Sequence, residues 1–82
     1  MRREYHIVVK NMTDSTITLN EMGNYDLPAG AEVDTNDRSR EGQHWISYRD
    51  TIRAIEELPG TQIAQLVQDG DLDYWFVLRL TG

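Results

Sequence analysis

The stretch that decides the fold is the last apolar run of the chain, Tyr74-Trp75-Phe76-Val77-Leu78-Arg79-Leu80. In an extended strand, alternate side chains point to opposite faces, so Trp75 and Val77 lie on one face and the even-numbered residues on the other. A strand that is wet on one side alternates apolar and polar residues, whereas this strand is apolar on both faces for most of its length. Something must therefore cover Trp75 and Val77.

Two interpretations of this strand stay open. In the first, two helices cover one face of the sheet and the long loop that carries Trp45 wraps the other. In the second, one face or edge is buried against another subunit, because aromatic side chains are what protein interfaces use as anchors.

The size and charge of the chain limit what it can do. Its 82 residues support one compact domain, and 39% of them are hydrophobic, enough for a modest core. The formal net charge of −6 repels phosphate backbones and anionic membranes, so we expect neither nucleic acid nor membrane as a partner. The absence of cysteine excludes disulfides, thiolate zinc sites and cysteine nucleophiles. Met1 to Glu4 is not followed by the apolar stretch of a signal peptide, so we expect a soluble protein made where it works.

The N-terminal part, residues 5–33, is predicted to be rich in strands. Residues 5–10 alternate with period two, which predicts a first strand, and a second strand follows from Thr16 to about Glu21. The turn Leu27-Pro28-Ala29-Gly30 then leads to a short third strand through Ala31 and Val33.

A polar loop and a helical hairpin are predicted next. Residues 34–43 contain no large apolar side chain, so we expect a surface loop that nothing ties to the core. Ser47 and Asp50 have capping-box spacing, and apolar residues follow at helical intervals: Tyr48, Ile52, Ile55 and Leu58. Pro59-Gly60 ends this helix, and Thr61 can cap a second one that carries Ile63, Leu66 and Val67 and ends at Gly70.

The predicted fold class is therefore α+β. A small, mostly antiparallel sheet contains a β-hairpin, the short third strand and a C-terminal strand over residues 72–80. A two-helix hairpin over residues 47–69 is inserted before that last strand.

No motif in the sequence indicates a chemical activity. Asp69, Asp71 and Asp73 resemble the start of a calcium loop, but Tyr74 and Leu80 stand where an EF-hand needs Gly and Glu. The two histidines, His6 and His44, have no metal-ligand spacing, no serine lies in a nucleophile-elbow context, and the glycines are dispersed at turns. We therefore expect no metal, no cofactor and no catalytic residue, and a protein that is not an enzyme.

The order of the segments resembles the small structural and fibre-associated proteins of tailed bacteriophage virions. The resemblance lies in the N-terminal pattern "Asn-x-Thr-x-Ser-x-Ile-Thr-Leu-x-x-x-Gly", here from Asn11 to Gly23, followed by the Pro-x-Gly turn at residues 28–30 and by Val33-Asp34. A terminal "Gly-Asp-Leu" step at residues 70–72 completes it. The resemblance implies a non-enzymatic virion component, made in the host cytoplasm, that decorates a capsid, joins the neck or tail, or attaches a fibre.

The implied partners are other virion proteins, namely a major capsid, portal, neck or fibre protein, and further copies of the chain. We expect an extended edge or the Trp75 and Val77 face to dock on a symmetric array, where many weak contacts act together. The candidate interface residues are Trp45, Tyr74, Trp75, Phe76 and Val77.

Two other classes of function remain open at this point. A small acidic inhibitor or regulator would use the charge of −6 to cover a basic site on a host protein, in a salt-sensitive complex. An enzyme subunit or small-molecule binding domain would instead respond to a ligand in a thermal-shift screen.

Overall fold

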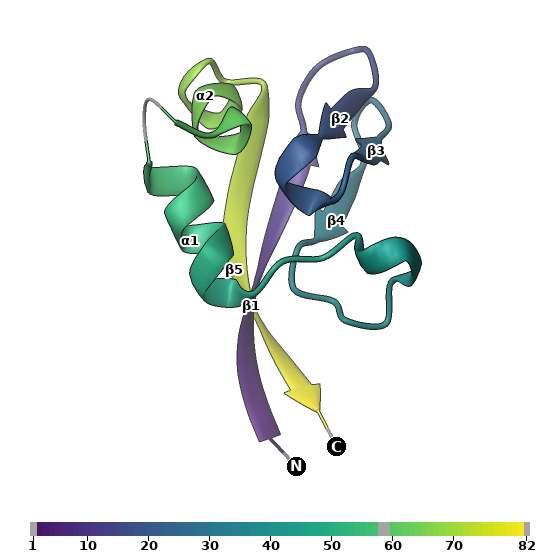
Figure 1. Cartoon of the computed structure of the whole chain (residues 1–82), viewed down its shortest axis with the longest axis vertical. Coiled ribbons are helices and arrows are strands. Elements are labelled where there is room, and N and C mark those ends of the chain that lie inside the picture. The colour runs from purple at the N-terminus through teal and green to yellow at the C-terminus, as the bar shows by residue number, and fades with distance from the viewer. Residues whose placement is uncertain (1, 58–59, 82) are drawn as a thin grey trace.

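Two ten-residue strands, β1 (Arg2–Asn11) and β5 (Leu72–Thr81), pair antiparallel along their whole length. The computed structural model describes residues 2–57 and 60–81. A third strand, β4 (Glu32–Asp34), pairs antiparallel with the other edge of β1, which gives the sheet order β4-β1-β5. Because β4 is short, β1 and β5 continue beyond it as a two-stranded ribbon that projects from the body and carries both chain ends (Figure 1).

The sequence favours the β1–β5 pairing because β-branched and aromatic side chains meet across it. Val8 lies opposite Trp75, and Ile7 lies opposite Phe76. Such cross-strand pairs stabilise a sheet by packing against each other. Residues directly opposite each other point to the same face, so Ile7 and Phe76 share one face and Val8 and Trp75 share the other.

A separate hairpin packs beside the sheet. It consists of β2 (Ile17–Leu19), the short 3-10 helix η1 (Asn20–Met22) and β3 (Tyr25–Leu27), and β2 and β3 pair antiparallel. Gly23 and Asn24 both have positive φ, which makes the tight turn between η1 and β3 possible. The strand β3 that follows this turn was not among the predicted strands.

The two helices begin where the sequence predicted. In α1 (Tyr48–Glu56), the side chain of Ser47 accepts a hydrogen bond from the backbone N–H of Asp50. In α2 (Gln62–Gln68), Thr61 accepts from the N–H of Ala64 in the same way. Gly70 has a φ of 81°, the left-handed conformation expected after α2. Leu58, predicted as the last apolar residue of the first helix, and Pro59, predicted to end it together with Gly60, lie outside the described residues.

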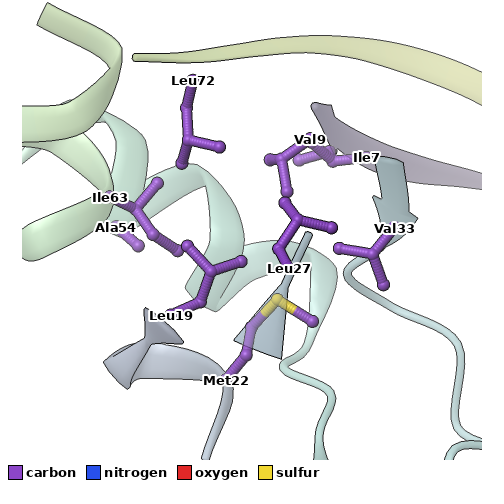
Figure 2. Packing of buried hydrophobic residues seen from close by; sticks show 9 residues of the cluster. All are labelled: Ile7, Val9, Leu19, Met22, Leu27, Val33, Ala54, Ile63 and Leu72. Atoms are coloured by element: carbon purple, nitrogen blue, oxygen red, sulfur yellow. The ribbon is translucent and has the colours of Figure 1, made fainter. Parts of the chain in front are cut away.

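The core lies on one face of the sheet, which we call the helix face. Figure 2 shows side chains from the sheet pointing toward side chains from the hairpin and the two helices. The buried residues are Ile7, Val9, Leu19, Met22, Leu27, Val33, Ala54, Ile63 and Leu72. The helices and the β2–β3 hairpin thus form one layer and the sheet forms the other, and the predicted α+β class is confirmed.

The loop after β4 departs from the prediction at its start. Thr35 and Asn36 are buried, although residues 34–43 were expected to have no tie to the core. The Thr35 N–H and hydroxyl both donate to the Ile7 carbonyl at 2.9 Å, and the Asn36 Oδ1 accepts from the Ile7 N–H at 2.8 Å. Asn36 also donates to the carbonyl of Ile46 at 2.9 Å. The prediction was wrong because hydrogen bonds, and not apolar burial, attach this segment to the sheet.

Candidate protein interface

The structure divides the five predicted interface residues among three places. Tyr74 and Phe76 lie on the helix face of β5, whereas Trp75 and Val77 lie on the opposite face. Trp45 lies outside the sheet, in the segment between η2 (Glu41–Gln43) and α1. Strand β5 therefore brings four of them together in pairs on opposite faces.

On the helix face, burial decreases along β5. Leu72 is 2% exposed in the core, Tyr74 is partly buried against the core, and Phe76 is 51% exposed. The rings of Tyr74 and Phe76 meet edge to face with centroids 6.2 Å apart, and the ring of Tyr48 lies 6.3 Å from that of Phe76. Phe76 therefore stands at the border between the core and the bare part of the ribbon.

Beyond Phe76 the helix face of the ribbon carries large apolar side chains in water. Leu78 is opposite Tyr5, and Leu80 follows on the same face. We call this surface the apolar ribbon patch, and its members are Tyr5, Tyr48, Phe76, Leu78 and Leu80. Monomeric proteins seldom expose apolar side chains in one contiguous group without a binding role.

The reason for the patch is a mismatch in length. Strand β5 has ten residues and spans about 33 Å, whereas α1 has nine residues and spans about 14 Å. A layer of helices this short covers only one end of the strand. The sequence shows the apolar alternation as far as Leu80, but the point at which the cover ends depends on the packing of the helices.

The opposite face of the ribbon differs from the helix face in how far its large apolar side chains are buried. Trp75 and Val77 are half-buried there, and their neighbours across the strand are Val8 and His6. Val8 is buried although it lies outside the core cluster. The loop was one candidate for covering this face, but Ile46, next to Trp45, packs against the core on the helix face.

Trp45 is held by the loop itself. The guanidinium of Arg38 lies 5.5 Å from the centre of the Trp45 ring, a distance typical of a cation–π contact. Arg40 makes a similar contact with Tyr25 at 5.2 Å. The Arg38 contact thus holds Trp45 against the loop and away from the aromatic residues of β5.

The outer edge of β5 has no neighbouring strand in the described part of the chain. The N–H of Thr35 donates to the carbonyl of Ile7, and the N–H of Asn11 donates to that of Ala31. Backbone groups alternate in direction along an antiparallel strand, so the odd-numbered residues of β1 point toward β4 and the even-numbered ones toward β5. The partners of the latter in β5 are odd-numbered. The even-numbered residues of β5 therefore have their backbone groups at what we call the open edge: Leu72, Tyr74, Phe76, Leu78 and Leu80.

A small charged network lies on the opposite face of the ribbon. His6 Nδ1 is 2.7 Å from Asp34 Oδ2, and its Nε2 is 3.4 Å from Glu4 Oε2. The Nε of Arg79 donates to the same Asp34 oxygen at 3.2 Å. Burial lowers the pKa of His6, but the hydrogen bonds and charges of Asp34 and Glu4 outweigh burial and leave the pKa raised. This network ties β1, β4 and β5 together at the base of the ribbon.

A cavity of about 370 Å³ adjoins the apolar ribbon patch. It shares Tyr5 and Tyr48 with the patch, and the rest of its lining is polar: Glu4, His6, Asn36, Arg38 and Ser47. A partner seated on the patch therefore has a polar recess beside it.

Comparison of the chain with known protein families, with curated proteins and with solved structures finds no match. The likeness to virion proteins therefore rests on the residues quoted above. Neither α1 nor α2 has the length and apolar content of a membrane span. Within residues 2–57 and 60–81, no three side chains that commonly bind metals come together.

Proposed function

We propose that this chain is a non-enzymatic structural protein of a tailed-phage virion, which acts through protein–protein contacts in a symmetric assembly. The observation that carries the proposal is the apolar ribbon patch, which lies directly beside the open edge of β5. The implied partners are a major capsid, portal, neck or fibre protein and further copies of the chain.

The patch supports this proposal through the hydrophobic effect. Leu80 and Tyr5 are each 62% exposed, and a partner that covers them removes apolar area from water. Each such side chain contributes on the order of 1 kcal/mol when it is covered. A contact of this size is weak alone, but a symmetric particle repeats it many times, so many weak contacts hold the component in place.

The open edge adds direction to the contact. An unpaired strand edge offers backbone donors and acceptors to an extended segment of another chain, which then joins the sheet as a further strand. Together, the edge fixes the orientation of the partner segment and the patch contributes apolar contact.

Particle association tests the proposal. The chain is produced during phage propagation, particles are purified on a density gradient, and the amount of chain per particle is measured by quantitative mass spectrometry. We expect Leu78→Asp to lower that amount about tenfold, because a carboxylate in the patch opposes its desolvation. The matched control is Met12→Asp, which changes a 53% exposed apolar residue outside the patch and should leave the amount unchanged.

Two outcomes would contradict the proposal. One is that the wild-type chain stays at the top of the gradient in a salt-sensitive complex with a host protein, which would favour an acidic inhibitor. The other is that Met12→Asp lowers the amount of chain per particle as much as Leu78→Asp does, although circular dichroism shows that both variants are folded.

A further inference from the structure

We propose that two copies of the chain pair through their open edges, with β5 antiparallel to β5 about a two-fold axis at Phe76. Each copy contributes the three strands β4-β1-β5, so the pair forms one continuous sheet. The pairing uses the same patch and edge as the proposed function and names a second copy of the chain as their partner, and its test needs only the purified chain.

The open edge has few of the features that normally prevent such pairing. Proteins protect edge strands with proline, lysine or inward-pointing charges. Strand β5 contains neither proline nor lysine, and its only charged residues are Asp73 and Arg79. One protective contact exists, because the Asp73 carboxylate accepts a hydrogen bond from the N–H of Tyr74 at 2.8 Å. In the pair, that N–H donates to the second copy and the carboxylate becomes available.

The two charges of β5 select one register. Residues directly opposite each other in an antiparallel pair point to the same face, and two-fold symmetry repeats every contact. When Phe76 lies opposite Phe76 of the second copy, Asp73 lies opposite Arg79 twice, and Trp75 lies opposite Val77 twice. A shift of two residues in either direction places Asp73 opposite Val77 or opposite the end of the strand. The register centred on Phe76 is therefore the one in which both charges of each strand are paired.

Arg79 can take part without giving up its contact within the chain. Its Nε donates to Asp34, which occupies one of the five N–H groups of the guanidinium. The remaining groups are free to meet Asp73 of the second copy. Asp73 and Arg79 lie at a position where the two strands exchange no backbone hydrogen bonds, and side chains are closest at such positions.

The same register covers the apolar ribbon patch. Antiparallel pairing places Leu80 of one copy opposite Leu72 of the other, and Leu72 lies under the helices at 2% exposure. The bare end of each ribbon thus comes beside the helical layer of the second copy, on the same face of the joined sheet. The pairing explains why the helices of one chain leave that end uncovered.

Charge reversal tests the register. Purified chain is analysed by size-exclusion chromatography with light scattering across a range of concentrations. We expect a wild-type dimer, and dimers about tenfold weaker for Asp73→Arg or Arg79→Asp alone, because each change places like charges opposite each other twice. A mixture of the two variants restores opposite charges at both contacts, so we expect a mixed dimer of about wild-type affinity.

Cysteine cross-linking gives a second readout that does not depend on those variants. The chain has no cysteine, so a single introduced thiol can cross-link only to the same position of another copy. At the two-fold axis the Cα atoms of residue 76 lie about 5.5 Å apart, within disulfide range, so Phe76→Cys should give a linked dimer on mild oxidation. Leu80→Cys is the control. Leu80 is more exposed than Phe76, but in this register residue 80 of one copy lies far from residue 80 of the other.

Several results would overturn the proposal. These are a wild-type chain that is monomeric at all concentrations tested, variants that fail to form the mixed dimer although each is folded, or a Leu80→Cys chain that links as fast as Phe76→Cys. Because all these measurements use the purified chain alone, they are independent of particle association.

Discussion

Asn11 closes the turn that follows β1 with its side chain. Its Nδ2 donates to the carbonyls of Ser15 at 2.7 Å and Leu27 at 2.9 Å, while its Oδ1 accepts from the N–H and hydroxyl of Thr13. The residue is fully buried, and these bonds join β1 to the β2–β3 hairpin. The Asn-x-Thr-x-Ser spacing in this chain therefore has a structural cause.

Replacement of Asn11 by Ala should lower the free energy of unfolding by about 2–4 kcal/mol, because it removes four hydrogen bonds and leaves buried backbone groups without partners. Urea unfolding measures the change. The same substitution at Asn20, an exposed residue, is the control and should change the free energy by less than about 0.5 kcal/mol. Equal losses at both positions would contradict the role of Asn11.

His6 makes the stability of the fold depend on pH. Its pKa is raised in the folded chain above the ordinary value of 6.5, so protonated His6 stabilises the folded state. This contribution is fully present below pH 6.5 and is lost as the pH rises through the raised pKa. We therefore expect the free energy of unfolding to fall as the pH rises from 6.5 through the raised pKa of His6.

The measurement is urea unfolding at a series of pH values between about 5.5 and 8.5, which spans the ordinary pKa of histidine. The decrease should become smaller in His6→Gln, and also in Asp34→Asn, which removes the closer carboxylate. A wild-type profile that is flat or rises with pH would show that the carboxylates do not hold the proton.

At the scale of elements, the hydroxyl of Thr61 connects the two helices of the helical hairpin. Thr61 accepts from the N–H of Ala64 and so caps α2, and the same hydroxyl donates to the carbonyl of Ala54 near the end of α1. The Ser47 hydroxyl, by contrast, caps α1 through Asp50. The two caps therefore differ in what they connect.

We expect Thr61→Ala to cost more than Ser47→Ala. The loss of a cap costs about 1 kcal/mol, and the additional bond to Ala54 adds about another 1 kcal/mol at Thr61. Thr61→Ser keeps the hydroxyl and should recover most of the loss. Chemical unfolding of the three variants checks the order, and equal costs for the two alanine variants would contradict it.

The elements with local signals could be predicted from the sequence. Ser47, Thr61 and Gly70 act within a few residues of their own positions, and each does what its pattern indicated. Strand β3 was not predicted, because its three residues lie between Gly23-Asn24 and Pro28, residue types that are typical of turns. The burial of Thr35 and Asn36 could not be predicted either, since their partners in β1 lie far away in the sequence.

For the candidate interface, the sequence identified the aromatic strand but favoured its Trp75 and Val77 face. In the structure those two side chains are half-buried, and the exposed apolar side chains of β5 lie on the face of Phe76. Tyr5, Leu78 and Leu80 did not stand out, because an apolar residue in a strand gives no sign of whether a helix covers it. That depends on the lengths of elements that pack together, which is a property of the whole molecule.

At the scale of the whole molecule, the core occupies one end of a long sheet. Leu72 and Leu80 lie on the same face of the same strand, yet one is 2% exposed and the other 62%. The single helical layer therefore divides the strand into a stabilising part and a part that is free to bind.

This division predicts different costs for one substitution at the two ends of β5. Leu72→Ala should lower the free energy of unfolding by about 2–4 kcal/mol, because it leaves a cavity in the core. Leu80→Ala should change it by less than about 0.5 kcal/mol in dilute, monomeric chain. Denaturant unfolding at low concentration checks both values, and a large loss at Leu80 would mean that the ribbon end is packed within the single chain.

The position of the chain ends has a mechanical consequence. Arg2 and Thr81 are paired at the tip of the ribbon, where the start of β1 and the end of β5 meet (Figure 1). A force that separates these two residues loads the cross-strand hydrogen bonds one pair at a time, beginning at the tip, and does not shear them all together. The ribbon therefore peels apart under tension before the core is strained, and the molecule yields most easily along the line between its two ends.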